Sequence, residues 1–248
     1  TKDQVAIDLP PKQEQALVLD LSSRHRKIYD TRLARERQKV LGLLGDWEKN
    51  RFQVFRSLSL LRQLSLHAAL VDESHHGVSS SKVDYLTEQL PELVAEGHNA
   101  LVFSQFTRFL HILTAHLDKV GIAYSYLDGS MNAAERADAV RRFTSGETKV
   151  FLISLKAGGF GLNLTEADYC FVCDPWWNPA AEAQAVDRAH RIGQTRPVNV
   201  YRLVSAGTIE ERVVALQDRK RALFDAVVDD GELFGTTISA DDIRAMIG

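Results

Sequence analysis

Two arginines near position 190 are the side chains in this sequence best suited to chemistry. The run from Asn178 to Gly193 predicts a helix, with Asn178 as its N-cap, Pro179 in its first turn and Gly193 as its stop. Four polar residues recur in it at helical spacing and would share one face: Gln184, Asp187, Arg188 and Arg191. A guanidinium is a planar fork of donors that stays charged, so two on one face suit a polyphosphate. A solvated face laced with ion pairs is the alternative.

A glycine-rich loop precedes this run, over residues 154–163, and contains Lys156, Gly161 and Asn163. Glycines and small side chains let a backbone approach phosphates closely. The G-x-x-x-x-G-K-[ST] spacing of a P-loop is absent from the sequence, and no Asp-Glu pair closes an apolar strand to hold magnesium. The sequence therefore predicts groups fit to touch a phosphate, no metal site, and no machinery to hold a nucleotide unaided.

From residue 81 onward, apolar strands alternate with amphipathic helices, which predicts an α/β fold with a parallel sheet covered on both faces. Ligands of such sheets gather at the carboxyl ends of the strands. Four loops follow predicted strands and are candidates for such a site: 104–105, 128–130, 154–163 and 175–178. A capping box at 208–211 opens the last long helix, expected to reach about residue 227.

The sequence divides into a lead-in with a helical elaboration over 1–75, the α/β region over 76–228, and an acidic tail over 229–248 that is expected to be peripheral. Apolar residues alternate over 5–9 and predict a short strand or an extended lead-in that Pro10 and Pro11 end. The first helix is rich in Arg and Lys over 24–39, which fits either a solvated face or a phosphate contact.

Composition narrows the class of protein. The 248 residues are 45% hydrophobic and 25% charged, with a net charge of −3, which is ordinary for a soluble domain and argues against a generally basic nucleic-acid binder. No apolar run approaches the roughly 20 residues of a membrane span. Cys170 and Cys173 should face opposite sides of one strand, so we expect core cysteines in a reducing compartment rather than a disulfide or a zinc pair.

Several runs, in order, resemble the motifs of one family. QAVDRAHRIGQ resembles the last motif of the superfamily-two helicases. SLKAGGFGLNL is similar to the S-T-R-A-G-G-x-G-x-N-L loop of the Swi/Snf family, with Leu155 at a position that is usually Thr. DPWWNP resembles its D-x-x-W-N-P motif in a form associated with bacterial members. ALVFSQFTRFLHIL, YLDGSMNAAERADAVRRF and VNVYRLVSAGTIEERV are similar to its flanking segments. The chain thus resembles the second, RecA-like motor lobe of the Swi/Snf double-stranded DNA translocases.

This resemblance implies a set of site residues. Arg188 and Arg191 would be the catalytic arginines that reach ATP, with Arg191 the favoured finger and Gln184 positioning them. Gly161, Asn163 and Asp187 would approach the nucleotide. Further residues would face DNA or couple it to the ATP site: Ser104, Gln105, Gly129, Lys156 and Trp176. One tryptophan of the Trp176–Trp177 pair should be functional and the other buried.

The resemblance also implies partners. ATP with Mg²⁺ would be held mainly by a first RecA-like lobe of the same protein, so the isolated chain should be inactive while the full-length protein is a DNA-dependent ATPase. Its partners would be double-stranded DNA and that first lobe, with no membrane and with protein targets left open. It would work in the cytoplasm of a bacterium, at the nucleoid, or in the nucleus of a eukaryote.

Two other functions stay open at this point: lobe two of an RNA helicase, and a non-catalytic module that binds a nucleotide or a protein. The double tryptophan, the RIGQ ending and the long helical lead-in favour the Swi/Snf type.

Overall fold

The computed structural model describes residues 9–155, 162–219 and 238–248. The chain forms two compact units, each assembled from three separate stretches. The sheet unit comprises Thr1–Leu17, Val83–Asp174 and Glu182–Leu203, and the helical unit comprises Val18–Lys82, Pro175–Ala181 and Val204–Gly248. The contiguous division at residues 75 and 228 that the sequence indicated therefore does not coincide with these units.

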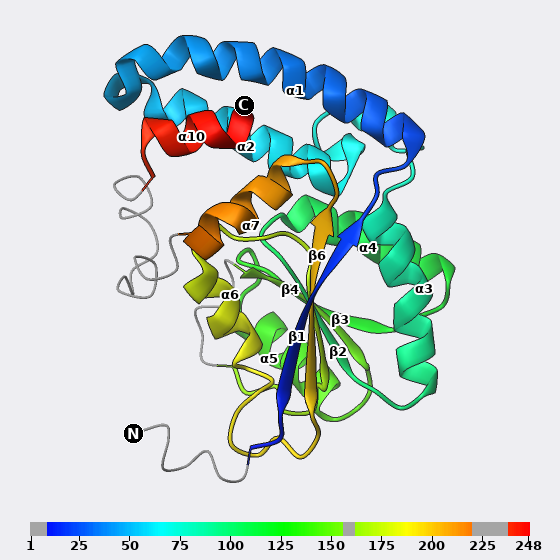
Figure 1. Ribbon diagram of the computed structural model, residues 1–248. Helices are drawn as coiled ribbons and strands as arrows, with labels where there is room; N and C mark the ends of the chain where they lie inside the picture. Colours follow the sequence, from blue (N-terminus) through cyan, green and yellow to red (C-terminus); the bar gives the residue numbers. More distant parts are fainter. Residues whose placement is uncertain (1–8, 156–161, 220–237) are drawn as a thin grey trace. The chain divides into compact units, whose positions relative to one another are not determined.

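A parallel sheet forms the centre of the sheet unit, as the sequence predicted. Its strands within the described residues are β1 (Lys12–Leu19), β2 (Ala100–Ser104), β3 (Tyr124–Leu127), β4 (Val150–Ser154), β5 (Tyr169–Val172) and β6 (Val198–Ser205), in the spatial order β1-β6-β5-β2-β4-β3 (Figure 1). β2 pairs in parallel with both β4 and β5, β3 with β4, and β5 with β6. The buried central strands read as near-continuous apolar runs because both of their faces are covered.

Helices cover both faces of this sheet. Alternate strand residues such as Leu101 and Phe151 form one core cluster with α5 (Ala133–Thr144) and α6 (Pro179–Val186). On the opposite face, the Tyr85 ring of α3 (Ser81–Ala95) meets the Phe171 ring edge to face, with centroids 6.4 Å apart. α4 (Thr107–Lys119) adds a buried leucine stripe. This is the two-layered covering that alternating strands and helices imply.

The two cysteines are buried and free, as the strand spacing predicted. Cys170 packs in the core cluster of the sheet, and burial raises the pKa of its thiol to about 12. It is a core side chain rather than a reactive thiolate.

The first strand in the described part of the chain is one that the sequence did not predict. Residues 5–8 of the expected short strand lie outside the described part, and β1 begins after the prolines, at Lys12. Val198 N donates to the Pro11 carbonyl at 3.1 Å, where β1 meets β6. Pro-Pro was interpreted as a stop, but proline is tolerated at the start of an edge strand, where its missing N–H faces away from the ladder.

The helical unit is built on α1 (Ser23–Leu43), α2 (Trp47–Leu66), α7 (Ile209–Arg219) and α10 (Ala240–Ile247). Buried within the unit, Lys82 Nζ bonds Glu210 Oε2 at 2.6 Å, and Ser205 N donates to the same oxygen at 2.8 Å. This carboxylate is thus compensated by a cation and by a backbone donor. None of the described helices is both long and apolar enough to span a membrane.

The end of the chain belongs to the core of the helical unit and is not a peripheral tail. Ile243, Met246 and Ile247 of α10 are buried in a cluster with residues of α1, α2 and α7. Figure 1 shows the α10 ribbon beside α1 and α2. Ser239 caps the helix in a reciprocal capping box with Asp242. The sequence interpretation gave more weight to the acidic residues of this segment than to its short apolar stripe. Met246 and Ile247 follow Ile243 by three and four residues, as one helix face requires.

We expect Ile243→Ala to lower the free energy of unfolding of this chain by about 2–4 kcal/mol, because it leaves a cavity at a fully buried position. Urea titration followed by circular dichroism measures the change. Arg244→Ala, at the exposed neighbouring residue, is the matched control and should cost about 0.5 kcal/mol or less. Equal small losses in both variants would place α10 outside the core.

Candidate functional site

A buried carboxylate organises the carboxyl ends of β2 and β5. Asp174, two residues after β5, has no exposed surface. It accepts hydrogen bonds from Ser104 Oγ at 2.5 Å and from Gln105 Nε2 at 2.6 Å. Ser104 and Gln105 were predicted to face DNA or to couple it to the ATP site, which stays a prediction, and the structure bonds both side chains to Asp174. Sequence reasoning missed Asp174, although its place directly after a buried strand marked it as a loop-edge carboxylate.

The loop after β3 is a compact polar turn. Asp128 Oδ1 accepts from Ser130 N at 2.8 Å and from Ser130 Oγ at 2.6 Å, and Oδ2 accepts from the Tyr126 hydroxyl at 2.8 Å. Burial acts to raise the pKa of Asp128, but the bonds from Ser130 and Tyr126 outweigh it and the pKa is lowered. Gly129 is exposed, and its carbonyl accepts from Arg136 Nη2 at 3.1 Å. The hydrogen bonds of Asp128 therefore hold the turn in place, and the Gly129 backbone is exposed at its tip.

The helix that carries the arginines ends earlier than the sequence predicted. α6 begins at Pro179, and Asn178 Oδ1 accepts from Ala180 N at 2.9 Å, as expected of an N-cap. The helix ends at Val186 and not at Gly193, which was predicted as its stop, and residues 187–193 follow as turns and bends, with Gly193 at φ 105°. The four polar residues therefore do not share one helical face: Gln184 lies on α6, whereas Asp187, Arg188 and Arg191 lie beyond it.

Two contacts from distant segments explain the early stop. The Arg188 carbonyl, which would accept a bond from residue 192 in a continuing helix, accepts instead from Leu164 N at 3.0 Å. Gln194 Nε2 donates to the carbonyls of Ala167 and Ala189, at 2.8 Å and 3.0 Å. The side-chain oxygen of Gln194 accepts from the backbone N–H groups of residues 195 and 196, each at 2.8 Å. The carbonyls of Arg188 and Ala189, which a longer helix would pair internally, are thus satisfied by Leu164 N and by Gln194 Nε2.

The two arginines have opposite environments. Arg188 is 6% exposed, and its Nη1 has no hydrogen-bond partner among the described residues. Burial lowers the pKa of its guanidinium from the ordinary value. Arg191 is exposed. A buried cation with an unmet donor is costly unless an anion can join it, which makes the Arg188 guanidinium a candidate group for a phosphate.

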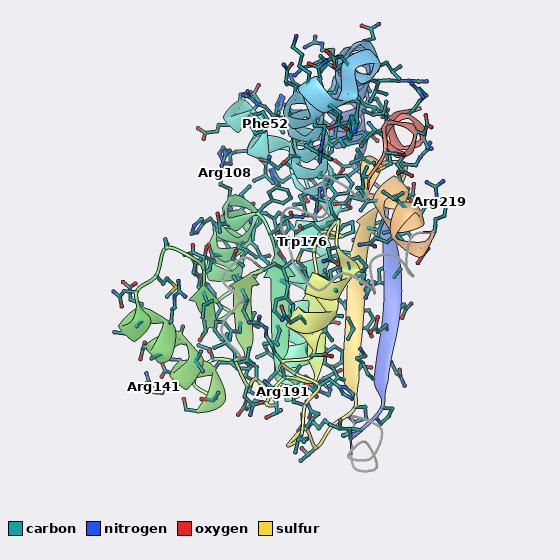
Figure 2. The ribbon with its side chains drawn as sticks, turned by 90° about the vertical axis from the view of Figure 1, so that its left-hand side faces the viewer. Phe52, Arg108, Arg141, Trp176, Arg191 and Arg219 are labelled. Carbon is teal, nitrogen blue, oxygen red and sulfur yellow. The ribbon has the colours of Figure 1, made fainter. Side chains whose placement is uncertain are left out.

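The predicted site residues of the sheet unit lie at opposite ends of the sheet. Residues 187–194 pack on the segment that leads into β5, because Gln194 bonds Ala167 and Leu164 bonds Arg188. That is the end where the strands begin, and Figure 2 labels Arg191 there. Ser104, Gln105 and Gly129 lie at the other end, where β2 and β3 finish. Asn163 is exposed, one residue before Leu164, whereas Lys156 and Gly161 lie outside the described residues.

Both tryptophans belong to the helical unit and are half-buried. The Trp177 ring packs against the core cluster of that unit and lies 5.0 Å from the Arg62 guanidinium carbon. Arg62 Nη2 in turn donates to the Pro175 carbonyl at 2.5 Å, and Gln217 Nε2 donates to the Trp176 carbonyl. Trp177 is thus the packing member of the pair, and Trp176, labelled in Figure 2, stays a predicted DNA contact.

Known proteins resemble this chain in sequence and in fold. Residues 81–193 match the family model described as helicase conserved C-terminal domain. The DNA repair protein RAD5 of Cryptococcus neoformans is 46% identical over 175 residues, which are 69% of this chain and 14% of that protein. The chain spans 14–17% of the length of the first curated relatives that it matches.

Two solved structures from Sulfolobus solfataricus extend the likeness over nearly the whole chain. The SWI2/SNF2 ATPase C-terminal domain is 27% identical with a TM-score of 0.74, and the match covers 95% of this chain and 97% of that one. The chain belongs to the Swi/Snf family. It is a C-terminal RecA-like lobe of that family, as its motifs predicted. The SWI2/SNF2 ATPase core in complex with dsDNA is 30% identical with a TM-score of 0.78, over 98% of this chain and 52% of that one.

We expect Asp174→Ala to lower the free energy of unfolding of this Swi/Snf lobe by about 2–4 kcal/mol. The substitution removes the acceptor of the Ser104 hydroxyl and the Gln105 amide and leaves both donors without a partner. Asp138→Ala removes an exposed carboxylate that pairs with Arg141 and should cost about 1 kcal/mol or less. Urea unfolding of both variants compares them. If Asp174→Ala matches the Asp138 control, the cluster contributes no stability.

Proposed function

We propose that this lobe is the second half of an ATP-dependent motor that moves along double-stranded DNA. Swi/Snf membership and the C-terminal RecA-like fold support a role in an ATPase. The likeness to an ATPase core whose structure contains dsDNA supports duplex DNA over RNA as the track. The lobe would supply arginines to a nucleotide held mainly by a first lobe and would provide one edge of the DNA path.

The observation that carries the proposal is the Arg188 guanidinium. It is 6% exposed, and Nη1 has no hydrogen-bond partner among the described residues. Taking an uncompensated cation out of water costs several kcal/mol, and natural chains keep such a group where a ligand compensates it. The oxygens of a nucleotide phosphate accept from a guanidinium in the planar geometry that Arg188 offers.

Arg188 and Arg191 would divide the work according to their exposure. Buried Arg188 is restrained by its surroundings, so it can hold a donor fork at a fixed place without losing much entropy on binding. Arg191 is free to approach the phosphates once ATP has brought the lobes together, when charge builds on the phosphoryl oxygens. Magnesium-bound ATP supplies the transferable phosphoryl group. The roles of Gln184, Asp187 and Asn163 near the nucleotide are part of the same proposal.

The proposed DNA contacts of the sheet unit lie where β2 and β3 finish, at the end of the sheet opposite the arginines. Because Asp174 already holds Ser104 Oγ and Gln105 Nε2, these two residues would shape the loop after β2 more than donate freely to DNA. The exposed Gly129 backbone would contact the track in the sheet unit, and Lys156 of the glycine-rich loop and Trp176 are each proposed separately as DNA contacts. Contacts of this kind read the phosphate backbone and not the base sequence, as a translocase requires.

We expect the isolated chain to hydrolyse no ATP, because it contains neither a P-loop nor an Asp-Glu pair for magnesium. Phosphate release by the purified chain, with and without duplex DNA, measures this, and the full-length protein is the positive control. DNA-stimulated turnover that persists through repurification of the chain would contradict the half-site model.

The Arg188→Met variant separates a catalytic arginine from a structural one. In the full-length protein we expect kcat to fall by about 10³-fold or more, because the guanidinium no longer meets the phosphate. The melting temperature without nucleotide should stay the same or rise, because an uncompensated buried charge is replaced by an apolar side chain of similar length. A variant that unfolds at lower temperature and keeps its turnover would make Arg188 a structural residue.

Arg191→Ala in the full-length protein should lower DNA-stimulated kcat by about 10³- to 10⁵-fold, while the Kd for ATP changes far less. Arg191→Lys should restore little, because an ammonium lacks the planar fork. Arg141→Ala, at an exposed arginine of α5, is the control and should keep full turnover. Turnover of Arg191→Ala close to that control would remove Arg191 from the mechanism.

A further inference from the structure

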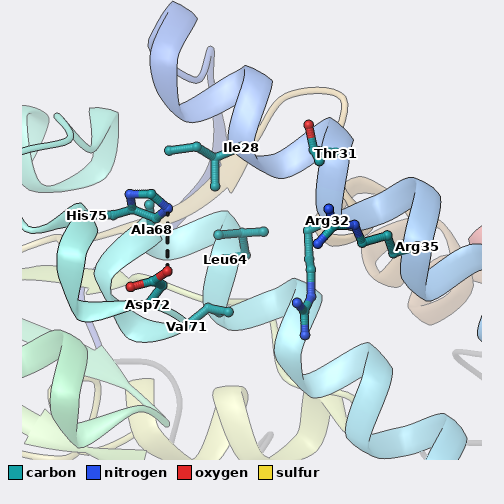
Figure 3. A pocket seen from close by; sticks show the side chains of 9 residues that line it. All are labelled: Ile28, Thr31, Arg32, Arg35, Leu64, Ala68, Val71, Asp72 and His75. Atoms are coloured by element: carbon teal, nitrogen blue, oxygen red, sulfur yellow. Dashed lines mark ion pairs between the residues drawn. The ribbon is translucent and has the colours of Figure 1, made fainter.

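A groove lies in the helical unit between α1 and the 3₁₀ turns that follow α2. It has a volume of about 230 Å³ and is lined by Ile28, Thr31, Arg32, Arg35, Leu64, Ala68, Val71, Asp72 and His75 (Figure 3). The four lining residues of α1 are spaced three and four apart, so they form one stripe of that helix. None of these residues has a part in the proposed motor chemistry.

The floor of the groove is apolar. Leu64 and Ala68 are buried, and the half-buried Ile28 and Val71 pack against the same small core cluster. An apolar floor gains free energy only from an apolar occupant, since a phosphate or a sugar would leave it unfilled and lose its own water. The floor therefore favours a protein side chain over a nucleic-acid backbone.

The α1 wall of the groove is positively charged. Arg35 is exposed and makes no ion pair among the described residues, while Arg32 Nε lies 3.0 Å from Glu36 Oε1. Arg24 and Lys27 on the same helix are also exposed, and neither forms an ion pair in the part of the chain that the structure describes. These cations were noticed in the sequence as a possible phosphate-binding helix, and the apolar floor beside them changes that interpretation.

The opposite wall is acidic. Asp72 accepts from Ser74 N at 2.9 Å through Oδ1, and its Oδ2 lies 4.0 Å from His75 Nε2 (Figure 3). A carboxylate of an occupant is therefore attracted at the α1 wall and repelled at the Asp72 wall. This asymmetry orients an occupant, with its acidic side toward Arg35 and its apolar side chain over the floor.

We propose that this groove is a docking site for an acidic protein segment whose apolar side chain enters between α1 and residues 68–72. The volume is smaller than the about 300–1,000 Å³ of a small-molecule site, and so suits one or two side chains of a peptide. Charge complementarity with Arg24, Lys27 and Arg35 selects acidic neighbours around that anchor. The surface would recruit a partner protein through such a segment, without touching ATP.

A fluorescein-labelled peptide with leucines one helical turn apart among glutamates tests this proposal by anisotropy with the full-length protein. Two further peptides carry serine in place of leucine, or glutamine in place of glutamate. We expect the leucine–glutamate peptide to bind and both altered peptides to bind at least about tenfold more weakly, because each lacks one of the two complementary features. Binding of the serine peptide as strong as that of the leucine peptide would reduce the site to general charge attraction and overturn the proposal.

Variants of the protein locate the site. Arg35→Glu and Ile28→Asp should each weaken the leucine–glutamate peptide by about three- to tenfold, and Asp72→Asn should strengthen it, because the repelling charge is removed. Arg37→Glu makes the same charge change at an exposed residue of α1 that does not line the groove, and should leave the Kd within about twofold. Equal weakening by Arg37→Glu would overturn the proposal.

Duplex DNA is the competing occupant. If Arg35→Glu and Ile28→Asp weaken duplex binding and leave peptide binding unchanged, the groove belongs to the DNA track and the proposal fails. Melting temperatures of all variants, which should stay within a few degrees of the parent protein, exclude unfolding as the cause. The result is independent of ATP turnover, so the motor function can stand or fall separately.

Discussion

The position of both arginines depends on one buried amide. Gln194 donates to the carbonyls of Ala167 and Ala189 and accepts from the N–H groups of Thr195 and Arg196, so one side chain satisfies four backbone groups around the arginine segment. Each of those groups would cost about 1–3 kcal/mol if it were buried unpaired. Because Gln194 satisfies them, the chain can leave helical geometry after Val186 and turn Arg188 into the protein while Arg191 stays outside. Together with the bond from Leu164, this amide joins the arginine segment to the end of the glycine-rich loop.

Two buried charged side chains, Glu210 and Arg188, have different environments. In the helical unit, Glu210 is buried together with Lys82 and a backbone donor, so its negative charge is compensated by groups of the same unit. In the sheet unit, Arg188 is buried with a donor that no described residue meets. A buried ion pair is compensated without a ligand, whereas a buried unpaired cation gains free energy when an anion binds to it. The contrast separates a structural ion pair from a candidate binding group without reference to any relative.

Patterns with a short range were predictable from the sequence, and features set by distant contacts were not. The parallel sheet, its covering helices and the Asn178 cap all follow from periodicity or local conformation. The early end of α6 was not predictable, because the competing donor comes from Leu164, far back in the sequence. Nor was the partner of Ser104, since Asp174 lies 70 residues away along the chain. In α10 the signal was present in Ile243 and Met246 but was outweighed by the acidic residues around it.

The cluster at Asp174 has a consequence for how this lobe can diverge among relatives. Asparagine at position 174 would replace one acceptor oxygen by an amide donor, which would then face the Gln105 amide or the Ser104 hydroxyl, both of which donate in this arrangement. A change at 174 therefore needs a matching change at 104 or 105 to restore the pairing of donors with acceptors. The three positions should drift through evolution as a coupled set, so that an aligned family would show correlated substitutions between the end of β2 and the residues after β5. A chimera that exchanges only one of these loops between two family members would combine donors from one protein with an acceptor from the other, and their hydrogen bonds would not match.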